Sequence, residues 1–317
     1  FDAFAFLERA DAWGMAGVHL SINGYNFRCA GGTDPGRLAA IAEDAAERGM
    51  FMETDTSGTE PGHLAAMARA ARQLGADCLR TYTRHKGNPD AVAAATVADL
   101  KAAAPRIADE GVTLLLENHE DFTGAEVTHI IQAVDHPAVA ALYDFGNSMN
   151  VVEEPMEAAR AMAPHVRSVH LKDHVVVSHE GQPLVVGVPI GAGHVAIADI
   201  LSLLIGASGL ERVCIENCYG YTAPLTRNAE KLAAAATSRT FAALDGPFDP
   251  AVVLLDADAL RRSDPDALFN LEEAAVARGI AHVRQILRDQ GFAPVLNGRG
   301  GIYRRGADEL AFDSRHF

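Results

Sequence analysis

Four short apolar segments of this chain each end in a side chain that can bind a metal ion, and their spacing restricts the fold more than any other feature. The four side chains are Glu117, Asp144, His170 and Glu216. Each follows a run of apolar, often β-branched residues, which is typical of a buried parallel strand. Their spacings are 27, 26 and 46 residues, and the first two match one strand–helix repeat of an α/β barrel. Because all strands of such a barrel end on one face, we expect the four side chains to converge there.

The rest of the chain supports this repeat, because Ala-rich helical stretches alternate with short apolar strands. Helices are predicted to begin where an acidic residue precedes a proline, at residues 34–35, 60–61 and 154–155, and another spans about 89 to 109. Alternation of helix and strand predicts a parallel sheet with right-handed crossovers. Seven strands are predicted, at residues 17–22, 50–54, 77–83, 112–117, 139–144, 166–172 and 212–217.

The expected fold is α/β: a (β/α)8 TIM barrel over residues 1–245, followed by a helical C-terminal extension over residues 246–317. Since a closed barrel has eight strands, the eighth strand either precedes residue 1 or is formed by the VVLLD segment at 252–256. The extension contains a predicted amphipathic helix at about 265–290, which packs on the barrel or forms a subunit interface.

The interval between His170 and Glu216 is about 20 residues longer than the intervals before it. Two β-rich arms within it flank residues 179–182, which predicts a β-hairpin inserted after a strand. An insertion at this point lies on the face where the ligands converge, so the hairpin is expected to form a wall or a lid of the site.

The composition of the chain limits the classes of protein to which it can belong. The chain has 317 residues, of which 49% are hydrophobic and 22% charged, as in globular proteins. Its net charge of −15 argues against a nucleic-acid partner, which requires a concentrated basic surface. No apolar run approaches a membrane span and no signal peptide is visible, so a cytoplasmic protein without a membrane partner is expected. The cysteines show no paired framework, which fits a reducing compartment; they are Cys29, Cys78, Cys214 and Cys218.

A site of carboxylates and one imidazole predicts one divalent metal ion as the cofactor, with Mn first and Mg, Co and Zn as alternatives. Open positions on such an ion accept a substrate carbonyl and a neighbouring hydroxyl, and the ion then stabilises an enediolate as a proton leaves the adjacent carbon. Glu117 and Glu216 would flank that carbon as base and acid. Taken singly, each carboxylate could instead form a salt bridge or a helix cap, but together at the same point of four repeats they favour a metal site.

Five short motifs resemble the xylose-isomerase-like barrel superfamily, which includes sugar isomerases and epimerases, inosose dehydratases, hydroxypyruvate isomerases and endonuclease IV. The motifs are ENH (117–119), DFGN (144–147), HLKD (170–173), GAGH (191–194) and IEN (215–217). The resemblance implies that Glu117, Asp144, His170 and Glu216 are metal ligands and that Glu117 and Glu216 move protons. Asn147 stands where the ketose epimerases usually have a substrate-binding His.

The position of Asn147 also argues against a nuclease. Endonuclease IV resembles this fold but holds three zinc ions, and it needs a His three residues after the aspartate. Here that residue is Asn147, and Gly-Ala-Gly-His194 replaces a downstream Asp-x-His pair. One metal site is therefore expected instead of a trinuclear cluster.

Further side chains near the predicted strand ends are candidates for substrate contact or catalysis. His119 is a catalytic acid or base, or else a structural loop residue. Lys172 shares a strand face with His170 and binds an anionic group or stabilises an enolate, or else pairs with Asp173. His174 extends the same alternation.

A second set of candidates lies after the third strand. Arg80, Tyr82 and Arg84 alternate at its end with His85 beside them, so Arg80 and His85 are expected to contact a substrate carboxylate or phosphate, with a surface salt bridge as the alternative. His19 and Asn23, near an earlier strand, are weaker candidates.

The leading hypothesis is a metal-dependent isomerase or epimerase acting on a small keto-sugar or sugar acid. A lyase of the same superfamily is the first alternative, either an oxo-sugar-acid decarboxylase or the barrel subunit of a lyase that cleaves 3-keto C-glycosides. A non-catalytic carbohydrate-binding barrel subunit is the second. The expected partners are a small carbohydrate and further copies of the chain, with a second subunit possible, and no nucleic acid.

Overall fold

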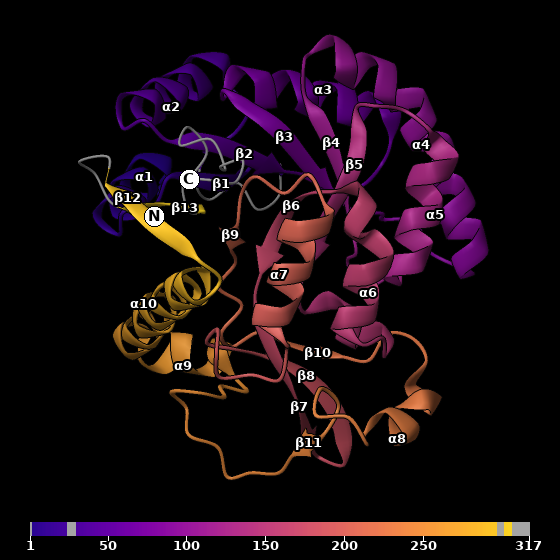
Figure 1. The fold of residues 1–317 in the computed structure, drawn as a ribbon, viewed down its shortest axis with the longest axis vertical. Helices are drawn as coiled ribbons and strands as arrows, with labels where there is room; N and C mark the ends of the chain where they lie inside the picture. The colour runs from indigo at the N-terminus through magenta and orange to yellow at the C-terminus, as the bar shows by residue number, and fades with distance from the viewer. Residues whose placement is uncertain (1, 24–29, 297–300, 306–317) are drawn as a thin grey trace.

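Seven parallel strands form a nearly closed barrel in the computed structural model, which describes residues 2–23, 30–296 and 301–305 (Figure 1). Neighbouring strands in the barrel follow their order in the chain, as predicted. They are β1 (Gly17–Ser21), β2 (Phe51–Asp55), β3 (Ala76–Thr81), β4 (Thr113–Glu117), β5 (Val139–Asp144), β6 (Val166–Leu171) and β9 (Cys214–Ile215).

The strand order is open between β1 and β9, and residues 252–256 do not close it. The alternative in which the VVLLD segment supplies the eighth strand is therefore wrong. Val253 is buried instead in a separate apolar cluster with Val175, Val177 and Val186 of the inserted hairpin, so the apolar residues of this segment serve packing and not a sheet.

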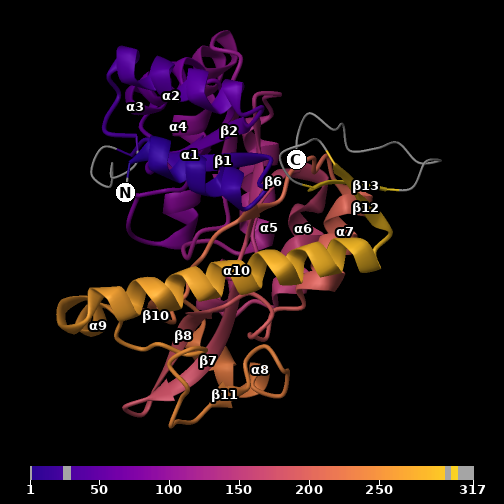
Figure 2. The ribbon, with the colours of Figure 1, turned by 90° about the vertical axis from the view of Figure 1, so that its left-hand side faces the viewer.

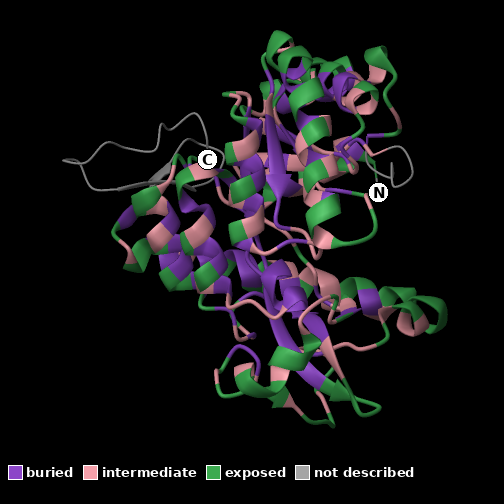
Figure 3. Cartoon of the chain, turned by 90° about the vertical axis from the view of Figure 1, so that its right-hand side faces the viewer, coloured by how far each residue is buried: buried purple, intermediate pink, exposed green. Residues whose placement is uncertain are grey.

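Helices cover the outside of the barrel, so that the strands are buried and the outer helix faces are exposed (Figure 3). Asp34, Glu60 and Asn88 accept hydrogen bonds from first-turn backbone N–H groups, and proline follows each of them. The helices are α1 (Ala3–Ala12), α2 (Pro35–Glu47), α3 (Pro61–Gln73), α4 (Pro89–Asp109), α5 (Gly124–Val134), α6 (Pro155–Met162) and α7 (Ile197–Ala207), with short 3-10 turns η1 (Asn147–Val151) and η2 (Ala163–His165).

The predicted hairpin lies between β6 and α7 as β7 (Asp173–His179) and β8 (Gln182–Val188). Its two-residue turn, Glu180-Gly181, has φ values of 51° and 75°, as a tight hairpin turn requires. Two further strands that the sequence did not predict, β10 (Thr222–Pro224) and β11 (Ala243–Leu244), extend it to a four-stranded sheet. A short 3-10 turn η3 (Ala229–Lys231) and helix α8 (Leu232–Ala235) connect them.

The C-terminal extension packs on its own chain. It contains α9 (Ala257–Ser263), the long helix α10 (Pro265–Asp289), and an unpredicted hairpin of β12 (Phe292–Leu296) and β13 (Gly301–Arg305). Figure 2 shows α10 crossing one side of the molecule, at the level where the barrel meets the four-stranded sheet. Arg284 on this helix donates to the carbonyl of Trp13 at 2.6 Å, at the end of α1. None of the helices in the described ranges is both long and apolar enough to cross a membrane. Cys78, Cys214 and Cys218 are free thiols, and Cys29 lies outside the described residues.

A buried ion pair ties the seventh barrel strand to the second. Arg212 comes just before β9, is only 5% exposed and lies 3.2 Å from Oε1 of Glu53, which is itself buried on β2. The same guanidinium binds the carboxylate of Asp77 on β3 at 2.6 Å. Removing one partner of such a pair leaves an uncompensated charge in a region that water does not solvate.

Replacing Arg212 by Met is therefore expected to lower the free energy of unfolding by about 3–5 kcal/mol, because Glu53 would remain buried without its guanidinium partner. Urea unfolding followed by circular dichroism measures the loss. Lys101→Met, at an exposed position of α4, is the control and should change stability by about 0.5 kcal/mol or less. The double variant R212M/E53M should recover part of the loss, and a single variant no less stable than the control would contradict this interpretation.

Candidate active site and metal centre

Three of the four predicted ligands meet at the carboxyl ends of neighbouring strands. Glu117 is the last residue of β4, Asp144 the last of β5, and His170 lies in β6; one ligand atom from each lies within 4.8 Å of the others. Nδ1 of His170 is 3.3 Å from Oε1 of Glu117 and 3.5 Å from Oε2 of Glu216, which follows β9. The barrel therefore brings all four side chains to one face.

Two cations lie among these carboxylates. Nζ of Lys172 is 2.7 Å from Oδ2 of Asp144 and 2.6 Å from Oε2 of Glu216, and a guanidinium nitrogen of Arg80 is 2.7 Å from Oε2 of Glu117. The alternative in which Lys172 pairs with Asp173 is not what the structure shows. Asp173 instead accepts backbone N–H groups at 2.8–3.2 Å from the loop after the hairpin and from its own neighbour; the donors are His174, Gly191, Gly193 and Val195.

With all three carboxylates ionised, the cluster carries one negative charge more than Arg80 and Lys172 offset. Burial raises the pKa of Asp144 to about 7, even though Lys172 opposes the shift. Burial also opposes ionisation of Glu117, but the charge of Arg80 holds the pKa of this carboxyl well below its usual range. Burial also opposes the ionisation of Glu216, whose side chain is 39% exposed, but the charge of Lys172 lowers the pKa of this carboxyl. An added cation would offset the surplus charge.

The ligand atoms also retain unused hydrogen-bonding capacity. Both carboxylate oxygens of Glu117, Oδ2 of Asp144, Nδ1 of His170 and Oε2 of Glu216 are buried and accept or donate no hydrogen bond within the described residues. Lys172 and Arg80 reach three of these oxygens as ion pairs at 2.6–2.7 Å, so the cluster has more acceptor oxygens than the two cations satisfy. Buried polar atoms are rarely left in this state, and three carboxylates with one imidazole form a donor set suited to a divalent ion. These residues fit such an ion.

The turn after β5 orients Asp144 so that only one oxygen remains available. Its Oδ1 accepts the N–H groups of Gly146 and Asn147, both at 2.9 Å, whereas Oδ2 points to the cluster. Asn118 holds the same residue from β4 by bonding its backbone N–H at 2.6 Å and its carbonyl at 3.0 Å. Gly146 is needed because a Cβ there would lie 1.9 Å from Nδ1 of His174. The sequence motifs contain these residues but gave no sign of their roles.

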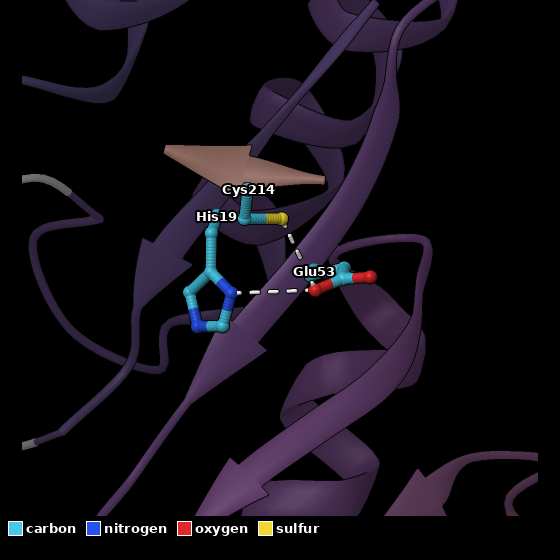
Figure 4. A group of neighbouring side chains, drawn as sticks. All are labelled: His19, Glu53 and Cys214. Atoms are coloured by element: carbon cyan, nitrogen blue, oxygen red, sulfur yellow. Dashed lines mark hydrogen bonds and ion pairs between the residues drawn. The ribbon is translucent and has the colours of Figure 1, made fainter. Parts of the chain in front are cut away.

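A second polar layer lies beneath the cluster, and Figure 4 shows three of its members, His19, Glu53 and Cys214. Nδ1 of His19 is 3.4 Å from Nε2 of His170, and the same ring lies between Glu53 at 3.4 Å and Asp55 at 3.5 Å. These atoms are spaced closely enough to hold an ion, but the chemistry does not favour one. Glu53 is already occupied by Arg212 and by a 2.8 Å bond from Ser168, and burial raises the pKa of the Cys214 thiol to about 11.

A cavity of about 580 Å³ opens above the cluster. Its inner end is lined by five of the side chains singled out from the sequence, namely Arg80, His119, Asn147, Lys172 and Glu216. Asn147 is 4% exposed, and its Nδ2 donates no hydrogen bond within the described chain, so it is free to bind an oxygen of a ligand. His119 stacks on Tyr82 with ring centroids 3.9 Å apart, and burial lowers its pKa.

Two predicted substrate contacts lie elsewhere. His85 bonds Asp99 at 2.8 Å and borders a separate groove, in the segment that follows the end of β3 at Thr81. His174 is buried behind the cavity with its Nε2 3.5 Å from Sγ of Cys218, because a new strand begins at Asp173. We therefore do not retain either as a substrate ligand. Asn23 donates to Ser57 at 2.9 Å and does not line the cavity.

Comparison with known proteins agrees with this architecture. A model of the family described as xylose isomerase-like TIM barrel matches residues 61–239, which is more than half of the chain. Over 150 residues the chain is 28% identical to 3-oxo-isoapionate decarboxylase of Pectobacterium atrosepticum, covering 46% of this chain and 53% of that protein. The chain spans about half the length of the curated relatives that it matches.

Solved structures share the fold at low sequence identity. D-psicose 3-epimerase of Clostridium cellulolyticum with D-tagatose is 11% identical, with a TM-score of 0.59, over 89% of this chain and 93% of that one. A xylose isomerase-like TIM barrel protein from Mycobacterium smegmatis in complex with magnesium is 16% identical, with a TM-score of 0.55, over 75% and 88%. The extent of the family match, together with the barrel itself, shows that the chain belongs to the xylose isomerase-like TIM barrel family.

Proposed function

We propose that this protein is a divalent-metal-dependent enzyme that moves a proton at the carbon next to a carbonyl group of a carbohydrate, with isomerisation or epimerisation as the outcome. The observation that carries the proposal is the convergence of three carboxylates and one imidazole at the inner end, or floor, of the cavity, where two cations pair only part of the buried ligand atoms. Glu117, Asp144, His170 and Glu216 would hold the ion, with Mn favoured and Mg, Co or Zn as alternatives. Bound there, the ion would polarise a substrate carbonyl and acidify the neighbouring C–H bond.

Among the residues at this floor, Glu216 is best placed to take the proton. It is the carboxylate that remains partly exposed and lines the cavity, and the charge of Lys172 keeps it ionised and thus able to act as a base. Glu117 is fully buried and paired with Arg80, so its exchange of protons with a substrate is more restricted. His119, in the cavity wall, is the second acid–base group that inversion at a carbon requires.

Two further side chains would orient the substrate. The free amide of Asn147 donates to a hydroxyl or carbonyl oxygen, and Lys172, beside Asp144 and Glu216, stabilises negative charge that develops on an oxygen above them. Because both groups are buried, their interactions with a substrate are not weakened by competing water.

Decarboxylation is the second candidate, and the similarity to 3-oxo-isoapionate decarboxylase favours it. The bond that breaks would then join the reacting carbon to a carboxylate, which leaves as carbon dioxide, and a proton replaces it. The same floor would serve both reactions, since each places negative charge on the carbon next to a carbonyl. The two differ in products, so they can be separated by experiment.

Glu216→Gln is expected to reduce proton exchange by about a hundredfold or more, because the amide cannot accept the proton and is a weaker ligand for the ion than a carboxylate. The assay incubates protein loaded with Mn in deuterium oxide with D-psicose, D-fructose or D-tagatose and measures deuterium in the recovered sugar by mass spectrometry. Glu230→Gln, at an exposed site, is the control and should match the original protein. Carbon dioxide released from a 3-oxo sugar acid, without exchange into ketoses, would support the decarboxylase, whereas absence of both Mn binding and turnover would refute the proposal.

His19 is expected to orient the His170 ligand. Metal-binding histidines are usually held through their other ring nitrogen, and here His19 is the side chain that meets Nε2 of His170. The rings meet edge to face with centroids 4.7 Å apart, and two carboxylates fix His19 in turn.

His19→Phe should therefore raise the dissociation constant for Mn about 10- to 100-fold, as loss of such outer contacts typically does. Isothermal titration calorimetry measures it directly, without a substrate. His19→Gln, which keeps a polar group near His170, should recover part of the affinity. Cys214→Ala is the matched control from the same layer and should bind Mn normally. Equal affinities in His19→Phe and the control would show that His19 has no orienting role.

A further inference from the structure

The cavity extends well beyond the metal ligands, and the C-terminal extension forms its far wall. The lining passes from the inner side chains to the segment 217–222, then to residues 255–258 and Arg261 in and before α9, and to Glu272 of α10. This wall is fixed in place. Gly220 approaches the extension so closely that a Cβ there would lie 3.1 Å from Cβ of Ala257, and the hydroxyl of Tyr219 donates to the carbonyl of Pro250.

Tyr221 presents an aromatic ring in this outer part of the cavity. It is 44% exposed, and among the described residues only Phe269 is also a large exposed hydrophobic side chain. Its hydroxyl donates to the carboxylate of Glu120, which holds the ring in one orientation. An exposed ring fixed in a concave, otherwise polar wall is suited to stack against a flat or apolar ring face of a ligand.

The charged side chains that line the outer part of the cavity disfavour the binding of anions. Four carboxylates line it, on Glu120, Asp256, Asp258 and Glu272, against one guanidinium, that of Arg261, which is already paired with Asp258. Glu272 forms no hydrogen bond or ion pair with the described part of the chain, so its oxygens are available to accept hydroxyl groups. A phosphate or carboxylate at this end would be repelled, whereas a neutral ring bearing hydroxyl groups would not.

We propose that the outer half of the cavity is a second binding subsite for a neutral ring stacked on Tyr221. The substrate would then be a glycoside or an oligosaccharide unit, in place of a free monosaccharide or a sugar phosphate. This inference rests on the proposed function for the identity of the reacting sugar in the inner half. The volume of about 580 Å³ lies within the range of sites for ligands larger than one small ring.

The test compares the affinity of the Mn-loaded protein for three probes, measured by ligand-observed NMR titration. Methyl β-D-glucopyranoside has one ring, phenyl β-D-glucopyranoside has two, and 4-carboxyphenyl β-D-glucopyranoside adds an anion to the outer ring. The phenyl glucoside should bind roughly three- to tenfold more tightly than the methyl glucoside, which is the effect of one aromatic stacking contact. The carboxylate should remove this advantage.

Tyr221→Ala should abolish the preference for the phenyl probe and leave the affinity for the methyl probe unchanged. Tyr221→Phe, which loses only the bond to Glu120, should keep most of the preference. Phe269→Ala is the matched control, since it removes an equally exposed ring that does not line the cavity. Equal affinities for the methyl and phenyl probes, or a preference unaffected by Tyr221→Ala, would overturn the subsite.

These outcomes are separate from those that test the reaction. A phenyl preference that depends on Tyr221, in a protein that neither binds Mn nor exchanges protons, would support the subsite and refute the proposed function. Deuterium exchange into monosaccharides without a preference for the phenyl probe would support the proposed function and overturn the subsite.

Discussion

The buried charge cluster at the carboxyl ends of the strands is the constraint on which the rest of the structure depends. Glu117, Asp144 and Glu216 sit where isolated carboxylates would be costly, and Arg80 and Lys172 offset only part of their charge. These five residues come from β3, β4, β5, and the chain just after β6 and β9. A slip of any one strand would leave a buried charge without its partner, so strand register and site geometry are specified by the same contacts.

The features that the sequence predicted correctly are those with a local period or a fixed spacing. Seven strands, the inserted hairpin and the convergence of the four strand-end side chains follow from alternation and repeat length, which depend only on neighbouring residues. The role of His19 could not be found in this way, because it contacts His170 from 151 positions away. His174 was expected to continue the alternation of β6, but that strand ends at Leu171 and a new one begins at Asp173. His85 was expected beside the alternating Arg80, Tyr82 and Arg84, but it bonds Asp99, which the local pattern does not indicate.

Apolar β-branched segments also show why the insertion and the extension could be predicted only in part. The VVLLD segment has the composition of a buried strand, but its Val253 packs against valines of β7 and β8 in a core separate from that of the barrel. A sequence pattern indicates that a segment will be buried, but it does not indicate which other segment will pack against it. The carboxylate of Asp173 is a second contact between the insertion and the chain that returns to the barrel. The backbone of residues 191–195 folds around this carboxylate, and α7 follows directly.

These contacts of the inserted hairpin relate the long interval between His170 and Glu216 to the choice of substrate. The insertion holds residues 248–255 through its apolar face, and these residues lead directly into the segment that closes the outer cavity. Under the proposed function, the inner part of the site would suit both proton transfer and loss of a carboxylate, since both place charge on the same carbon. The substrate bond that lies over Glu216 would then decide between them, and the proposed outer subsite would fix this by holding the distant end of the substrate. The choice of reaction would then depend on the extension as much as on the metal ligands.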